Sequence, residues 1–95
     1  MIHRFKNLEN DYLFWLNENP KGFVMNHFGS NDPTYNRIHK ASCFTLHRKS
    51  DDGARTRYEK VCSNNLDELV GKANDLRGTN GWGYCKLCSP EVKED

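Results

Sequence analysis

The feature that most constrains this chain is a pair of cysteines separated by two residues, Cys85-Lys86-Leu87-Cys88. Two thiolates at this spacing can bind one tetrahedral metal ion from a single tight turn. Redox-active motifs use the same spacing, but a thioredoxin-like site lies between a strand and a helix. Here the motif follows a predicted helix, and no helix is predicted behind it. The pair therefore indicates a metal site, whose other ligands must come from elsewhere in the sequence.

The composition explains why a domain of this size benefits from such a site. Only 36% of the 95 residues are hydrophobic. A chain this short buries roughly 60% of its unfolded surface, so a metal or disulfides often supplement its core. The N-terminal residues lack the apolar segment of a secretory signal, and no apolar run approaches about 20 residues. We expect a single cytoplasmic domain spanning residues 1–95, in which clustered cysteines bind metal.

The second half of the metal site has five candidates: His27, His39, Cys43, His47 and Cys62. His39 and Cys43 form the best pair, because both can project from one tight bend where a strand ends. Cys43 and His47 have the same spacing, but an extended chain between them would separate the two side chains by roughly 13 Å. Cys62 ends a predicted strand, where a free cysteine behaves as a small buried hydrophobe. If His39 is not a ligand, Cys62 is its substitute in an all-cysteine site with four thiolate ligands.

Two amphipathic helices are predicted from apolar residues at helical spacing. The first covers residues near 8–16, with Asn7 or Asn10 as its cap, and ends before Pro20. The second begins at an Asn65 cap, with Glu68 as the partner in a capping box, and ends at Gly78.

Three extended segments complete the predicted fold, at residues 23–28, 35–48 and 55–62. A loop at 49–54 contains an Asp-Gly pair that is typical of hairpins, so the last two segments are expected to pair. The sequence thus predicts an α+β domain with a three-stranded antiparallel sheet flanked by two helices. Residues 91–95 are expected to form a charged tail.

The candidate ligands stand in a longer pattern: His39-Lys-Ala-Ser-Cys43, then Val61-Cys62-Ser63, then Gly83-Tyr84-Cys85-Lys-Leu-Cys88-Ser-Pro90. This pattern resembles the zinc domain of Ada-type DNA repair proteins. It also resembles related His-x-x-x-Cys…Cys-x-x-Cys modules attached to some bacterial nuclease-like proteins. The resemblance covers about residues 38–90 and implies one Zn2+ bound by His39, Cys43, Cys85 and Cys88.

The same resemblance bears on the chemistry of the site. In Ada-type domains, a zinc-bound cysteine at the first ligand position accepts a methyl group from a phosphotriester. His39 stands at that position here, and an imidazole is a far poorer methyl acceptor than a thiolate. An alkyl-acceptor role for Cys43 or Cys62 is therefore kept only as a third interpretation. Four ligands close the coordination shell, as in structural zinc sites, and we expect a recognition module and not an enzyme.

Local clustering of basic residues indicates what such a module recognises. The net charge is only +1, so any basic surface must come from clustering along the chain. The predicted contacts to nucleic acid, most simply DNA, are Arg48, Lys49, Arg55, Arg57 and Lys60, with Trp82 as an exposed stacking aromatic. Because acidic residues lie among these cations, a solvated hairpin of mixed charge is an equal alternative.

A protein–protein interaction module within a larger bacterial or phage assembly is the second functional hypothesis. Phe14 lies off the apolar stripe of the first predicted helix, which makes it a candidate for contact with a partner.

Overall fold

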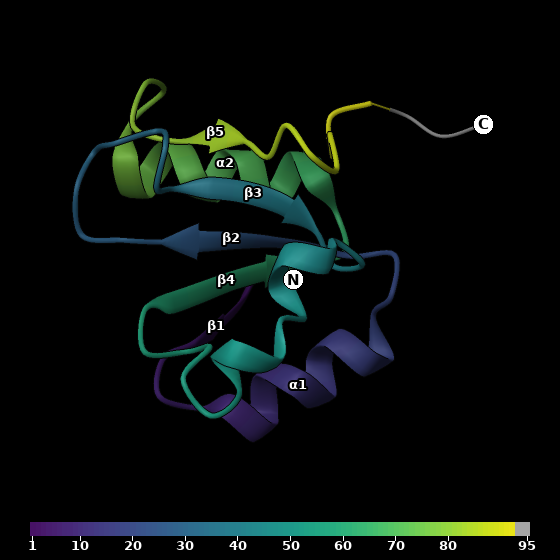
Figure 1. Cartoon of the computed structure of the whole chain (residues 1–95). Helices are drawn as coiled ribbons and strands as arrows, with labels where there is room; N and C mark the ends of the chain where they lie inside the picture. The colour runs from purple at the N-terminus through teal and green to yellow at the C-terminus, as the bar shows by residue number, and fades with distance from the viewer. Residues whose placement is uncertain (93–95) are drawn as a thin grey trace.

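The computed structural model describes residues 1–92 and shows an α+β fold built on a five-stranded mixed sheet (Figure 1). The strands lie in the order β1-β4-β2-β3-β5, and every neighbouring pair is antiparallel except β3 and β5. The elements in chain order are β1 His3–Phe5, α1 Glu9–Glu18, β2 Phe23–His27, β3 Arg37–Lys40, the 3-10 helices η1 Phe44–Leu46 and η2 Lys49–Asp51, β4 Glu59–Ser63, α2 Leu66–Arg77 and β5 Gly83–Tyr84.

Side chains of successive strand residues form two cores, one on each face of the sheet. Met25, Ile38 and Val61 pack with α2 on one face. Val24 and Cys62, each next in sequence to one of these residues, pack with α1 on the opposite face. Figure 1 shows the two α-helices on opposite sides of the sheet. The face toward α1 is the one that carries the candidate site.

Helix α2 begins and ends where the sequence predicts. The Asn65 side chain accepts a hydrogen bond from the backbone N–H of Glu68 at 3.0 Å. Gly78 follows the helix with a φ of +71°, a left-handed conformation that glycine adopts at little cost. The Glu68 carboxylate accepts from the Ser63 hydroxyl at 2.7 Å, so only one half of the predicted capping box forms.

Helix α1 covers the opposite face with one apolar side. Tyr12, Trp15 and Leu16 are buried against the sheet, whereas Phe14 is 66% exposed, as predicted from its place off the apolar stripe. The chain then turns closely past the helix at Gly22. A Cβ atom at this position would lie 2.7 Å from the Trp15 ring, so the turn requires glycine.

The sheet is larger than the three-stranded antiparallel sheet predicted. Strands β1 and β5 contain only three and two residues, too few to show a recognisable periodicity. The segment predicted as one strand at 35–48 is extended only over Arg37–Lys40, and then bends and continues as η1.

The hairpin predicted at 48–60 does not form, because η2 and successive turns lead to β4, and β2 lies between β3 and β4. The segment is instead bonded to Glu9 of α1. Its carboxylate accepts from the backbone N–H groups of Gly53 at 3.0 Å and Arg55 at 2.8 Å, and from the Arg55 guanidinium at 2.8 Å. These bonds tie the segment to α1 and not to the sheet.

Three smaller predictions concern the cap of α1, the C-terminal tail and membrane-spanning segments. The N-cap of α1 is Leu8, and not Asn7 or Asn10. Of the charged tail predicted at 91–95, residues 93–95 lie outside the described part of the chain. Within residues 1–92, no helix has the length and apolar character needed to cross a membrane.

Candidate metal centre

Four side chains predicted as metal ligands come together on the α1 side of the sheet. The ligand atoms of His39, Cys43, Cys85 and Cys88 all lie within 4.8 Å of one another. The first three residues are buried and Cys88 is half-buried. One imidazole and three thiols are donors that zinc accepts in tetrahedral structural sites, so this group could hold such a metal. We refer to these four residues as the metal group.

Strand β3 and the bend after it position the first two members. His39 pairs with Val24 of β2, on the face that packs against α1. The backbone N–H of Cys43 donates to the Lys40 carbonyl at 2.9 Å, which closes a tight turn directly after the strand. The Cys43 carbonyl accepts from the N–H of Leu46 at 3.0 Å, and η1 begins there. His39 therefore projects from the end of the strand and Cys43 from the turn directly after it, close to the single bend that the sequence predicts.

The Cys-x-x-Cys segment is held against the same strand. The backbone N–H of Cys85 donates to the Ile38 carbonyl at 2.9 Å, and that of Ser89 donates to the Cys85 carbonyl at 2.9 Å. The N–H of Lys40 donates to the Cys88 sulfur at 3.2 Å. A donated N–H favours the thiolate, which is the form of cysteine that binds metal.

The protonation state of His39 also suits a ligand. Burial lowers the pKa of this imidazole to about 4, and the charges of Lys60 and Arg37 contribute to the fall. The ring is therefore neutral near pH 7, which is the form in which histidine binds a metal ion.

The pKa values of the Cys85 and Cys88 thiols are shifted in opposite directions. Burial raises the pKa of Cys88 to about 12, and the neighbouring sulfurs of Cys43 and Cys85 contribute to the rise. Burial also opposes ionisation of Cys85, but N–H groups of Cys88 and Leu87 hold the pKa of its thiol below the usual value. Three thiolates this close would repel one another, and a divalent ion bound among them would supply the compensating positive charge.

Two residues that sequence reasoning missed contact the metal group. Asn26 Nδ2 is hydrogen-bonded to His39 Nε2 at 3.1 Å, and Asn26 Oδ1 accepts from Lys60 Nζ. Thr45 Oγ1 lies 3.0 Å from Cys43 Sγ and 3.4 Å from His39 Nδ1. Bonds of this kind orient a ligand ring. No local pattern singles out Asn26; only its strand register, which places it opposite Lys60, reveals its role.

The other candidate ligands lie outside the metal group. Cys62 is fully buried in the core beside α1, and burial raises the pKa of its thiol, as expected of a core cysteine. His47 Nε2 is hydrogen-bonded to the Ala41 carbonyl at 2.8 Å. His27 Nδ1 is hydrogen-bonded to the Glu59 carboxylate at 2.7 Å. The all-cysteine arrangement with Cys62 in place of His39 is therefore not the one observed.

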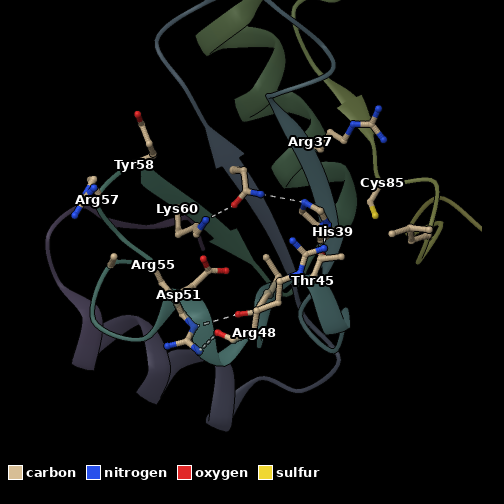
Figure 2. A pocket seen from close by; sticks show the side chains of 14 residues that line it. Arg37, His39, Thr45, Arg48, Asp51, Arg55, Arg57, Tyr58, Lys60 and Cys85 are labelled. Carbon is tan, nitrogen blue, oxygen red and sulfur yellow. Dashed lines mark hydrogen bonds between the residues drawn. The ribbon is translucent and has the colours of Figure 1, made fainter.

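A cleft of about 490 Å3 opens beside the metal group (Figure 2). His39 and Cys85 form part of its wall, and Lys60 reaches it from β4. Its basic lining residues are Arg37, Arg48, Arg55, Arg57 and Lys60, and Asp51 is its one acidic lining residue among residues 1–92. We call this feature the cationic cleft.

No known protein family, curated protein or solved structure matches this chain. The resemblance to Ada-type zinc domains therefore stays at the level of the motif, and the function is argued from the site itself.

The cationic cleft gathers some of the predicted nucleic-acid contacts. Arg48, Arg55, Arg57 and Lys60 line it, whereas Lys49 does not. The side chains of Arg48 and Arg57 have no hydrogen-bond or ion-pair partner within residues 1–92, and both residues are exposed. These two guanidinium groups are available to a ligand.

Arg55 and Trp82 have structural roles that the sequence did not indicate. The Arg55 side chain is 9% exposed and forms ion pairs with Glu9 at 2.8 Å and Asp52 at 2.7 Å. Its guanidinium is therefore already neutralised. Trp82 is half-buried, and its Nε1–H donates to Asn74 Oδ1 at 2.7 Å. The prediction of an exposed Trp82 was wrong, because the ring packs on the core beside α2.

Proposed function

We propose that this chain is a zinc-stabilised module that binds nucleic acid, most simply DNA, through the cationic cleft. The observation that supports this proposal is a set of four cleft cations that have no carboxylate partner among the described residues 1–92: Arg37, Arg48, Arg57 and Lys60. Asp51 contributes one negative charge, and three thiolates around a divalent zinc ion contribute one more. The cleft thus keeps two net positive charges, although the chain as a whole has a charge of only +1.

The metal has a structural role in this proposal. When bound, zinc would fix the end of β3 and the Cys-x-x-Cys segment by closing a four-ligand shell. His39 is hydrogen-bonded to Asn26, which is also hydrogen-bonded to Lys60, so one amide holds two residues that line the cleft. We assign no catalytic step to the metal group, since its four protein donors leave no open position for water.

Phosphate binding at the cleft is tested by its dependence on salt. We expect a labelled DNA oligonucleotide of about 20 nucleotides to bind in fluorescence anisotropy, and binding to weaken steeply between about 50 and 200 mM salt. The double variant Arg48→Ala/Arg57→Ala removes two phosphate contacts and should lower the slope of log K against log salt by about 2. Lys72→Ala is the matched control, because it removes a cation from α2 on the opposite face.

Two results would contradict this function. One is the absence of any DNA or RNA binding by the zinc-loaded protein at low salt. The other is an identical salt slope for Arg48→Ala/Arg57→Ala and for Lys72→Ala, which would place the bound phosphates elsewhere.

A protein-interaction module is the second candidate, and the exposure of apolar residues on α1 favours it. Phe14 is 66% exposed, and its neighbour Leu13 is 37% exposed. In this case the protein would bind no nucleic acid, and its association would depend on Phe14. Sedimentation of the wild type and of Phe14→Ala tests the simplest form, a second copy of the chain as the partner. Identical monomeric behaviour of both proteins would count against that form.

A further inference from the structure

Three aromatic rings form a connected group that reaches the cationic cleft through Tyr58. The ring centroids of Phe28 and Tyr58 are 4.4 Å apart, and those of Phe28 and Tyr35 are 5.8 Å apart. Tyr58 is 53% exposed and Tyr35 is 58% exposed. Tyr58 also lines the cleft, so one ring belongs to both features (Figure 2). We call these three residues the aromatic platform.

The platform is not part of either hydrophobic core. None of its rings belongs to the buried clusters on the two faces of the sheet or to the partly buried residues packed on them. Its position is nevertheless fixed. The backbone N–H of Phe28 donates to Asn36 Oδ1 at 2.7 Å, and Asn36 Nδ2 donates to the carbonyls of Ser30 and Gly81. Asn36 itself is fully buried, so it anchors the loop that carries two of the three rings.

Proteins that bind single-stranded nucleic acid combine exposed aromatic rings with neighbouring cationic side chains. Its bases can stack on aromatic side chains while the backbone phosphates contact arginine and lysine. A duplex cannot use the rings in this way, because its bases are already stacked and paired, although its phosphates could still reach the cations. Arg57 and Tyr58 are adjacent in sequence at the point where these two kinds of contact meet.

We propose that the ligand of the cationic cleft is single-stranded nucleic acid, whose bases stack on Tyr58 and Tyr35 while its phosphates contact Arg57, Arg48 and Lys60. This inference rests on the proposed function, since it names the form of nucleic acid that the same cleft takes. This arrangement assigns no protein group to the base edges, so binding should tolerate many nucleotide sequences.

The experiment compares one labelled single strand with a hairpin duplex of the same length, by anisotropy at one salt concentration. We expect the zinc-loaded wild type to bind the single strand about tenfold or more tightly than the duplex. Tyr58→Ala should weaken binding to the single strand roughly tenfold and leave duplex binding unchanged, whereas Tyr58→Phe keeps the stacking face and should retain the preference. Phe14→Ala is the control for loss of an exposed aromatic elsewhere.

The outcomes separate this inference from the proposed function. Equal binding of single strand and duplex, both weakened by Arg57→Ala, would overturn the single-strand assignment and leave the cleft as a phosphate site. Binding of neither form would overturn both. If thermal unfolding shows that Tyr58→Ala is not folded, Tyr35→Ala carries the same test, and an unchanged single-strand preference in that variant contradicts the platform.

Discussion

Removing one ligand should remove most of the stabilisation of this domain by zinc, and His39→Ala is the most informative change. His39 provides the one nitrogen of the metal group, and its side chain is 6% exposed. Loss of a residue that merely orients a ligand weakens metal binding about 10- to 100-fold, and the loss of a ligand itself should cost at least as much. The same change also removes packing, but that cost is equal with and without zinc.

The magnitude follows from ligand linkage. At a free zinc concentration about 100 times the wild-type Kd, binding stabilises the folded state by about 2.7 kcal/mol. For a domain of this size, each kcal/mol shifts Tm by about 4–8 °C, so zinc should raise the Tm of the wild type by about 11–22 °C. A 100-fold weaker site under the same conditions gains only about 0.4 kcal/mol, which corresponds to about 2–3 °C.

The assay is thermal unfolding of reduced, chelator-treated protein with and without added zinc, together with native mass spectrometry. Cys62→Ala is the matched control: it removes a buried thiol from the same core but not from the metal group, and should keep the full zinc-dependent shift. Cys88→Ser tests the half-buried ligand if His39→Ala does not fold without metal. A full zinc-dependent shift in both ligand variants, or its loss in Cys62→Ala, would refute the ligand assignment.

Three further predictions concern the scaffold around the site. Tyr12 carries a buried hydroxyl without a hydrogen-bond partner in the described part of the chain. Urea unfolding should therefore show Tyr12→Phe to be as stable as the wild type or more stable by about 1 kcal/mol. A clear loss of stability would reveal that the hydroxyl has a partner. Leu69 of α2 is fully buried in the core between this helix and the sheet. Leu69→Ala should lower the free energy of unfolding by about 2–5 kcal/mol without changing the zinc content, since the metal group lies on the other face of the sheet. Loss of zinc from the folded variant would contradict this. Burial alone would raise the pKa of Glu9, but Arg55 and the N–H groups of Gly53 and Arg55 hold it below the unfolded value. The contribution of Glu9 to the free energy of unfolding is therefore present above the pKa of this residue in the unfolded chain. It is lost as the pH falls through the lower pKa of the folded protein. The unfolding free energy of Glu9→Gln should fall less steeply than that of the wild type as the solution is acidified from about pH 5 to 3, and parallel curves would show that Glu9 is not the titrating group.

The parts of the molecule that are encoded locally were predicted well. Helix α2 has a capping residue at one end, a glycine at the other and an apolar stripe between them, and it spans the predicted residues. His39 and Cys43 are close because a single turn joins them, and Cys85 and Cys88 because of the two-residue spacing. In each case the interacting groups lie within a few residues of one another, so the sequence pattern contains the geometry.

The parts that depend on distant residues were not predictable in this way. Glu9 and Arg55 are 46 positions apart, and nothing in either local sequence indicates the ion pair that holds the 48–58 segment against α1. The insertion of β2 between β3 and β4 is likewise a matter of sheet order, which alternating hydrophobicity does not specify. The cations predicted at 48–60 were therefore placed on a hairpin that does not form, and one of them, Arg55, proved to be structural.

The same sheet order brings the metal group and the cleft together. Because β2 is central, Asn26 lies beside both outer neighbours: it is paired in register with Lys60 of β4 and reaches His39 of β3 with its amide. Had β3 and β4 formed the predicted hairpin, no β2 side chain could stand between a ligand and a cleft cation. The geometry instead makes the orientation of His39 and the position of Lys60 depend on one side chain. A metal that fixes His39 would thus also help to hold Lys60 in the cleft, so zinc binding and the proposed binding of nucleic acid should be thermodynamically coupled.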